Sequence, residues 1–153
     1  MIREQLTSAM KDAMRAKAEP ATTTIRMINA AIKQKDIDVA RPRGDQQIGD
    51  DEILNLLQSL IKSRRESVEM YKQGGRQELA DKEEAEIAII TQFLPKQMTE
   101  EETKAVVREL AASLGASSVK DMGKVMAALK TKYAGQLDMT KASAIVKQVL
   151  AGS

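Results

Sequence analysis

Apolar side chains recur at every third or fourth position along most of the chain, which is the spacing of one face of an α-helix. The first stripe, formed by Ile2, Leu6, Met10 and Ala13, predicts a helix over residues 2–17. Similar stripes follow to the end of the chain, separated by only three prolines and eight glycines. The pattern therefore predicts an all-α fold built from seven helices.

A second helix is expected from Pro20 to about Asp38. Proline suits the first turn of a helix, because the N–H that it lacks has no partner there. The segment from Val39 to Gly49 is polar and contains Pro42 and Gly44, so it is predicted to be a loop.

Three acidic residues at 50–52 mark the start of a third helix, where the helix dipole favours negative charge. Its apolar stripe continues to Tyr71, and Gly74-Gly75 ends it. A fourth helix carries Leu79 to Leu94. The two-glycine connection predicts that these helices form a long antiparallel hairpin.

Pro95 closes the fourth helix and marks the expected domain boundary. We expect a helical N-terminal domain at residues 1–97 and a small three-helix domain at residues 98–153. Thr99 and Glu102 have the spacing of a capping box, in which each side chain satisfies a free backbone amide. The later helices are separated by glycines and by predicted caps, with Ser118 and Asp121 before one helix and Asp138 or Thr140 before the next.

Composition narrows the possible chemistry. The chain has no cysteine and no histidine, which excludes disulfides, thiolate catalysis and the commonest general base and transition-metal ligand. Neither a phosphate-binding glycine loop nor a nucleophile elbow is present. No apolar run approaches the roughly 18 residues that span a bilayer, and the polar N-terminus is unlike a signal peptide. We therefore expect a cytoplasmic protein without catalytic residues, metal or cofactor.

Two charged residues interrupt the apolar stripes of the predicted hairpin. Arg64 falls at the centre of the third helix's stripe, and Glu83 at the centre of the fourth's, at similar distances from the turn. We predict that they form a half-buried ion pair. Fixing the register of the hairpin is the favoured role for this pair.

The C-terminal segment is basic. Residues 115–153 carry six lysines, two aspartates and no arginine. Lysines without arginine suit electrostatic attraction to phosphates better than the reading of individual bases. Lys120 and Lys124, placed one turn apart on the sixth helix, are the first candidates for phosphate contact. Gly123 would let a nucleic-acid backbone approach, and the supporting candidates are Lys130, Lys132, Lys141 and Lys147.

Several segments resemble the GatB/YqeY family over nearly the whole chain. Residues 24–33 read TIRMINAAIK and residues 61–76 read IKSRRESVEMYKQGGR. The run from Leu79 to Glu86, the Phe93-Leu94-Pro95 triplet and the DMGKVM sequence at residues 121–126 continue the resemblance.

The resemblance implies a helical domain followed by one similar to the tail of the B subunit of glutamine-dependent amidotransferases, which act on misacylated tRNA. It also brings the family label of carbon–nitrogen ligase activity with glutamine as amido-N-donor. The leading hypothesis is a tRNA- or RNA-associated module without catalytic activity of its own. The alternative is an adaptor that docks on an amidotransferase or another translation enzyme, and a free-standing amide-forming enzyme is the third.

Overall fold

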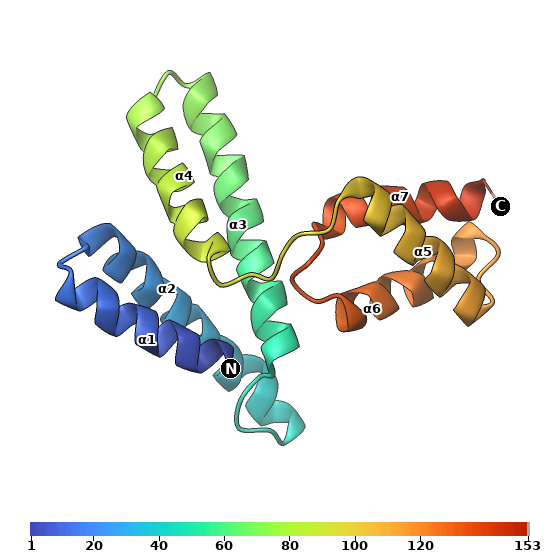
Figure 1. The fold of residues 1–153 in the computed structure, drawn as a ribbon, viewed down its shortest axis with the longest axis horizontal. Helices are drawn as coiled ribbons and strands as arrows, with labels where there is room; N and C mark the ends of the chain where they lie inside the picture. Colours follow the sequence, from blue (N-terminus) through green and yellow to red (C-terminus); the bar gives the residue numbers. More distant parts are fainter. Residues whose placement is uncertain (153) are drawn as a thin grey trace. The chain divides into compact units, whose positions relative to one another are not determined.

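The computed structural model describes residues 1–152, and its regular elements there are all helical (Figure 1). No strand occurs among these residues, which confirms the all-α prediction. The chain divides into two compact units, Met1–Leu94 and the part that begins at Pro95.

The first unit opens with two antiparallel helices, α1 (Ile2–Arg15) and α2 (Glu19–Lys35). The connection is tight because Lys17 adopts a left-handed backbone conformation, with φ 55°. The first helix ends at Arg15, two positions before the predicted limit. Pro20 lies in the first turn of α2, as its missing N–H allows.

The predicted loop after the second helix is partly wrong. The backbone continues beyond α2 as a π-helical turn, η1 (Asp36–Ala40), and then a 3₁₀ turn, η2 (Arg41–Arg43). Pro42 fits inside η2 because a short 3₁₀ turn does not require its N–H. Gly44, with φ 94°, ends the helical run, so the irregular segment is shorter than the sequence indicated.

A long helix, α3 (Asp50–Gln73), and α4 (Gln77–Thr91) form the second pair of the first unit. Figure 1 shows them side by side and antiparallel, joined by a short turn. Gly75 has φ 71°, a conformation that glycine adopts without the cost incurred by other residues.

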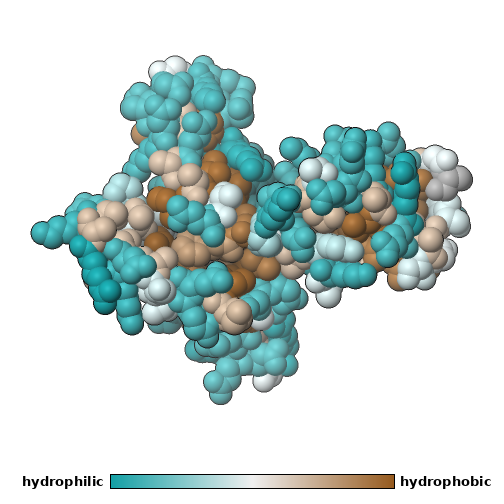
Figure 2. Space-filling view, viewed as in Figure 1, coloured by the Kyte–Doolittle hydropathy of each residue, from teal (hydrophilic) through white to brown (hydrophobic). Residues whose placement is uncertain are grey.

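The core of the first unit lies where the two helical pairs meet, and α2 packs against α4. Its fully buried side chains include Leu6, Ile28, Ile53, Leu57 and Ile90. Figure 2 shows apolar surface gathered over this middle region, whereas the free end of the α3–α4 hairpin is hydrophilic. The apolar stripes read from the sequence thus supply the packed faces.

The second unit contains α5 (Glu100–Leu114), the 3₁₀ turn η3 (Val119–Asp121), α6 (Met122–Lys132) and α7 (Met139–Ala151). Each of the three α-helices packs against the other two. The shared core has fully buried Val107, Val125, Leu129 and Val146 at its centre.

Local signals at the ends of these helices explain their limits. The Thr99 hydroxyl accepts a hydrogen bond from the Glu102 amide at 3.1 Å, and the Glu102 carboxylate accepts one from the Thr99 amide. The predicted capping box is therefore confirmed. Gly115 ends α5 with φ 67°, and Asp138, rather than Thr140, caps α7 by accepting from two backbone amides.

The predicted cap of the sixth helix is wrong. Ser118 precedes η3 rather than α6, and its side chain makes no capping hydrogen bond. The Asp121 carboxylate instead accepts from the backbone amide of Ser117 at 3.1 Å. The 3₁₀ turn therefore shifts the start of the α-helix to Met122.

Candidate nucleic-acid-binding surface

The six candidate lysines all lie on the surface of the second unit. They are distributed as Lys120 in η3, Lys124, Lys130 and Lys132 on α6, and Lys141 and Lys147 on α7. Each is exposed to solvent. Within residues 1–152, none of these ammonium groups is paired with a carboxylate. Their positive charge is therefore available to a partner.

The structure corrects one detail of this arrangement. Lys120 belongs to η3 and not to the sixth helix, so it precedes Lys124 across a change from 3₁₀ to α-helical geometry. The 3₁₀ turn is wound more tightly than an α-helix. The two side chains consequently do not stand at the one-turn α-helical spacing that the sequence indicated.

The remaining lysines do not form a single stripe. With 3.6 residues per turn, Lys124 and Lys130 are about 120° apart around α6. Lys141 and Lys147 are likewise about 120° apart around α7. The positive charge is thus spread around the unit, a distribution that suits phosphates approaching from several directions better than one narrow contact line.

Gly123 lies exposed in the first turn of α6. A Cβ atom built on it would have no atom within 4 Å apart from its two neighbours in the chain and the nearby backbone of α6. Close packing inside the protein therefore does not explain the glycine. The bare backbone leaves space beside Lys124 for a group from outside.

One aromatic ring accompanies the lysines. The Lys132 ammonium lies 5.7 Å from the centre of the Tyr133 ring, within the range of a cation–π interaction. Tyr133 is half-buried and packs against the core of the second unit. A ring held in this way offers little free face for stacking on a base.

Basic side chains of the first unit are arranged differently, because several of them are paired with carboxylates. Four such groups are Arg3 with Asp36, Arg43 with Asp45 and Glu52, Arg64 with Glu83 and Glu86, and Lys72 with Glu84. The positive charge of these side chains is therefore partly neutralised, and their role is structural.

Arg64 lies between two carboxylates of the neighbouring helix. Its Nε is 3.0 Å from the Glu86 Oε2 and 3.9 Å from the Glu83 Oε2. The three side chains are 16%, 24% and 23% exposed, in the order Arg64, Glu86, Glu83. The same guanidinium donates to the Leu60 carbonyl and to the sulfur of Met27. The contact of Arg64 with Glu83 is therefore the longer of the two. Glu86 is the carboxylate that accepts a hydrogen bond from Arg64.

Sequence reasoning missed a second polar cluster, centred on Asp36. The Arg3 guanidinium donates to both Asp36 oxygens, at 3.1 and 2.8 Å, and the Ile48 amide donates to one of them at 2.9 Å. Asp36 is only 8% exposed. The hydrogen bonds from Arg3 hold the pKa of the Asp36 carboxyl below its usual range, although burial acts in the opposite direction. The one sequence signal for this cluster is that Asp36 continues the apolar face of α2, four residues after Ile32.

Among residues 1–152, no group of three acidic side chains is gathered so that it could hold a metal ion. No helix in that range is both long enough and apolar enough to cross a membrane.

Comparison with known proteins identifies the family. The family model described as Yqey-like protein matches residues 3–150. The chain belongs to the YqeY-like family. Its fold is thus that of a YqeY-like protein over almost the full length of the sequence.

Curated relatives include fungal proteins named altered inheritance of mitochondria protein 41, mitochondrial. The protein from Eremothecium gossypii is 33% identical over 113 residues, which cover 70% of this chain and 60% of the relative. That from Pyrenophora tritici-repentis is 30% identical over 131 residues, covering 82% and 70%. That from Vanderwaltozyma polyspora is 34% identical over 85 residues, covering 56% and 44%. The match to the Eremothecium and Vanderwaltozyma proteins spans less than two thirds of their length.

Proposed function

We propose that this YqeY-like chain is a tRNA-associated helical module, related to the tail of glutamine-dependent amidotransferases. In this proposal its second unit contacts RNA phosphates and catalyses no reaction by itself. The observation that carries the proposal is the set of six exposed lysines whose charges are not neutralised within residues 1–152. Each can approach a phosphate without first breaking an internal ion pair.

The charge pattern supports contact with the RNA backbone more than the reading of a sequence. Lysine offers a mobile point charge, whereas base recognition relies mainly on planar, bidentate side chains. RNA binding by such a surface depends strongly on salt, because each phosphate contact releases condensed counterions. We therefore expect affinity for many tRNA species, with little preference among sequences.

Replacing Lys120 and Lys124 with glutamine is expected to weaken tRNA binding and to flatten its salt dependence. Each lost phosphate contact removes roughly 0.7–0.9 from the slope of log K against log salt concentration, so the double variant should lose about 1.4–1.8. Fluorescence anisotropy with labelled tRNA at several salt concentrations measures both quantities.

The matched control replaces Lys11 and Lys62, two exposed lysines of the first unit, with glutamine. The change in net charge is the same, so a general electrostatic effect would alter both double variants equally. An equal loss in the two proteins would remove Lys120 and Lys124 from the binding surface. Absence of tRNA binding by the unaltered protein at low salt would refute the proposed function itself.

Exposed apolar side chains favour a second candidate, an adaptor that docks on an amidotransferase or another translation enzyme. Leu114 at the end of α5 and Val119 in η3 are 42% and 44% exposed. Such side chains are typical of protein contacts when they occur together on a surface. Co-purification of a translation enzyme that persists after nuclease treatment, and is lost on replacing Leu114 with serine, would favour this function over RNA binding.

The compartment is part of the same proposal. We place the chain in the cytoplasm, and the relatives' names offer the mitochondrion as the alternative. Cell fractionation of the tagged protein distinguishes the two, and a mitochondrial location would direct the search toward organellar tRNA.

A further inference from the structure

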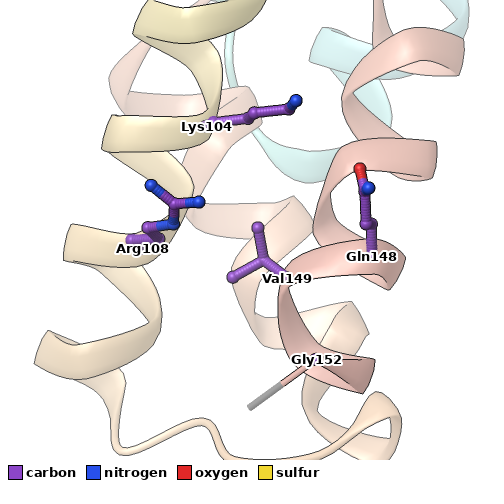
Figure 3. Close-up of a pocket in the computed structure, with 5 residues that line it drawn as sticks. All are labelled: Lys104, Arg108, Gln148, Val149 and Gly152. Atoms are coloured by element: carbon purple, nitrogen blue, oxygen red, sulfur yellow. The ribbon is translucent and has the colours of Figure 1, made fainter.

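A groove of about 320 Å³ lies between α5 and α7 in the second unit. Its lining residues are Lys104, Arg108, Gln148, Val149 and Gly152. Figure 3 shows the Lys104 and Arg108 side chains extending from α5 toward α7, with the Gln148 amide on the opposite side and Val149 between them. Polar groups from two helices thus converge on one space.

The charge in this groove is positive. Arg108 is exposed, and within residues 1–152 its guanidinium is not paired with a carboxylate. Lys104 lies 3.4 Å from Glu100, which is 73% exposed, so water strongly screens that ion pair. The last carbonyl groups of α7 contribute only about half a negative charge. Two full positive charges therefore prevail over the opposing ones.

The donor set distinguishes between possible anions. Arg108 presents a planar fork of N–H groups, Lys104 a mobile ammonium, and Gln148 an amide that can donate or accept. A carboxylate has two oxygens, which one arginine fork can satisfy alone. A phosphate group has further oxygens for the lysine and the glutamine. The volume of the groove is also far larger than one water molecule needs, which leaves room for such an ion.

We infer that this groove binds a phosphate group, held by Arg108 and Lys104 from α5 and by Gln148 from α7. The site is separate from the six candidate lysines, since none of them lines it. The inference goes beyond the proposed RNA function, because the groove would hold a phosphate group whether that group is free or part of an RNA backbone.

The first experiment titrates inorganic phosphate into the ¹⁵N-labelled full chain at constant ionic strength, with chloride as the competing anion. We expect saturable shifts of the amide signals of Gln148, Val149 and Gly152. Replacing Arg108 with glutamine should weaken phosphate binding at least about tenfold, which corresponds to about 1.4 kcal/mol. Replacing Lys104 should cause a smaller loss, because the lysine ammonium is a point charge without the bidentate fork of arginine.

The matched control is Lys11→Gln, which removes one exposed positive charge from the first unit, outside the groove lining and outside the six candidate lysines. Unchanged phosphate affinity in this variant, together with the loss in Arg108→Gln, supports the site. Shifts that do not saturate, that spread over all the exposed lysines, or that persist in Arg108→Gln would overturn it.

A second titration with tRNA distinguishes the source of the phosphate group. If the backbone of RNA enters the groove, tRNA shifts the same three amides, and Arg108→Gln weakens tRNA binding more than Lys11→Gln. If only inorganic phosphate shifts them, the groove serves a free phosphate group. Failure of the unaltered chain to bind tRNA would refute the proposed function but not phosphate binding in the groove. Failure to bind inorganic phosphate would refute only the proposal that the groove binds phosphate.

Discussion

Replacing Asp36 with alanine is expected to lower the free energy of unfolding of the first unit by about 2–3 kcal/mol, below the cost for a fully buried pair because water reaches part of Arg3. The change removes a buried carboxylate that accepts hydrogen bonds from Arg3 and from the Ile48 amide. The Ile48 amide would then lose its acceptor, and Arg3 would keep only its hydrogen bond to the Ile48 carbonyl. An unsatisfied buried donor is costly. Urea unfolding followed through the NMR signals of Ile28 and Leu57, which lie in the core of this unit, measures the loss.

The stabilisation that Asp36 gives the folded state decreases as the pH falls. Because the folded state holds the pKa of this carboxyl below its usual value, the stabilisation is fully present above the unfolded pKa of about 3.9. It is lost as the pH falls below that value and through the lower pKa of the folded state. The difference between the two proteins should thus be constant from pH 7 to pH 5 and shrink at pH 3.

Asp12→Ala is the matched control, because Asp12 is an exposed carboxylate on α1 in the same unit. We expect it to change stability by less than about 0.5 kcal/mol. An Asp36→Ala variant as stable as this control would show that the Arg3–Asp36 cluster contributes nothing to the fold.

Replacing Arg64 with alanine is expected to destabilise the first unit by about 2–3 kcal/mol. The change leaves two carboxylates facing each other without their shared cation, and it also removes the hydrogen bond to the Leu60 carbonyl. Loss of one partner from a fully buried ion pair costs about 3–5 kcal/mol. The cost is smaller here because water reaches part of Glu83 and Glu86. The same NMR-detected urea unfolding measures it, and Lys62→Ala on the exposed side of α3 is the control.

Double-mutant cycles resolve the two carboxylates. Arg64 should couple more strongly to Glu86 than to Glu83, because only the Glu86 oxygen lies within hydrogen-bonding distance of Nε. Stronger coupling to Glu83 would contradict the geometry described above and restore the pair expected from the sequence.

The sequence was sufficient for features that depend on neighbouring residues. The apolar stripes predicted helices, and the Thr99–Glu102 spacing predicted a capping box, because each signal lies within one or two helical turns. The exposure of Lys124 followed from the same periodicity, since this residue lies opposite the apolar positions of α6.

Features that join distant parts of the chain were beyond that reasoning. Asp36 meets Arg3 across 33 residues and Ile48 across 12, and no periodic pattern encodes such a meeting. The sequence therefore predicts the end of a regular helix and a loop where the structure has a π-helical turn that contains Asp36.

The partner of Arg64 in the α3–α4 hairpin was likewise not predictable from apolar periodicity alone. The apolar stripe placed Glu83 opposite Arg64, but Glu86 lies nearly one turn further along the same face and is the closer partner. The choice between them depends on the register of α3 against α4, which the geometry of the turn at Gly74-Gly75 sets. Periodicity identifies a face and does not identify a register.

The contrast between paired cations in the first unit and unpaired lysines in the second has a genetic consequence. Substitution of Arg3 or Arg64 removes part of the fold, so the altered protein would be degraded and its cellular amount would fall. Substitution of Lys120 or Lys141 breaks no internal ion pair, so the protein would accumulate normally while its interactions change. A screen that scores abundance separately from phenotype would distinguish alleles of Arg3 and Arg64, which lower abundance, from alleles of the exposed lysines, which spare it and would mark the binding surface.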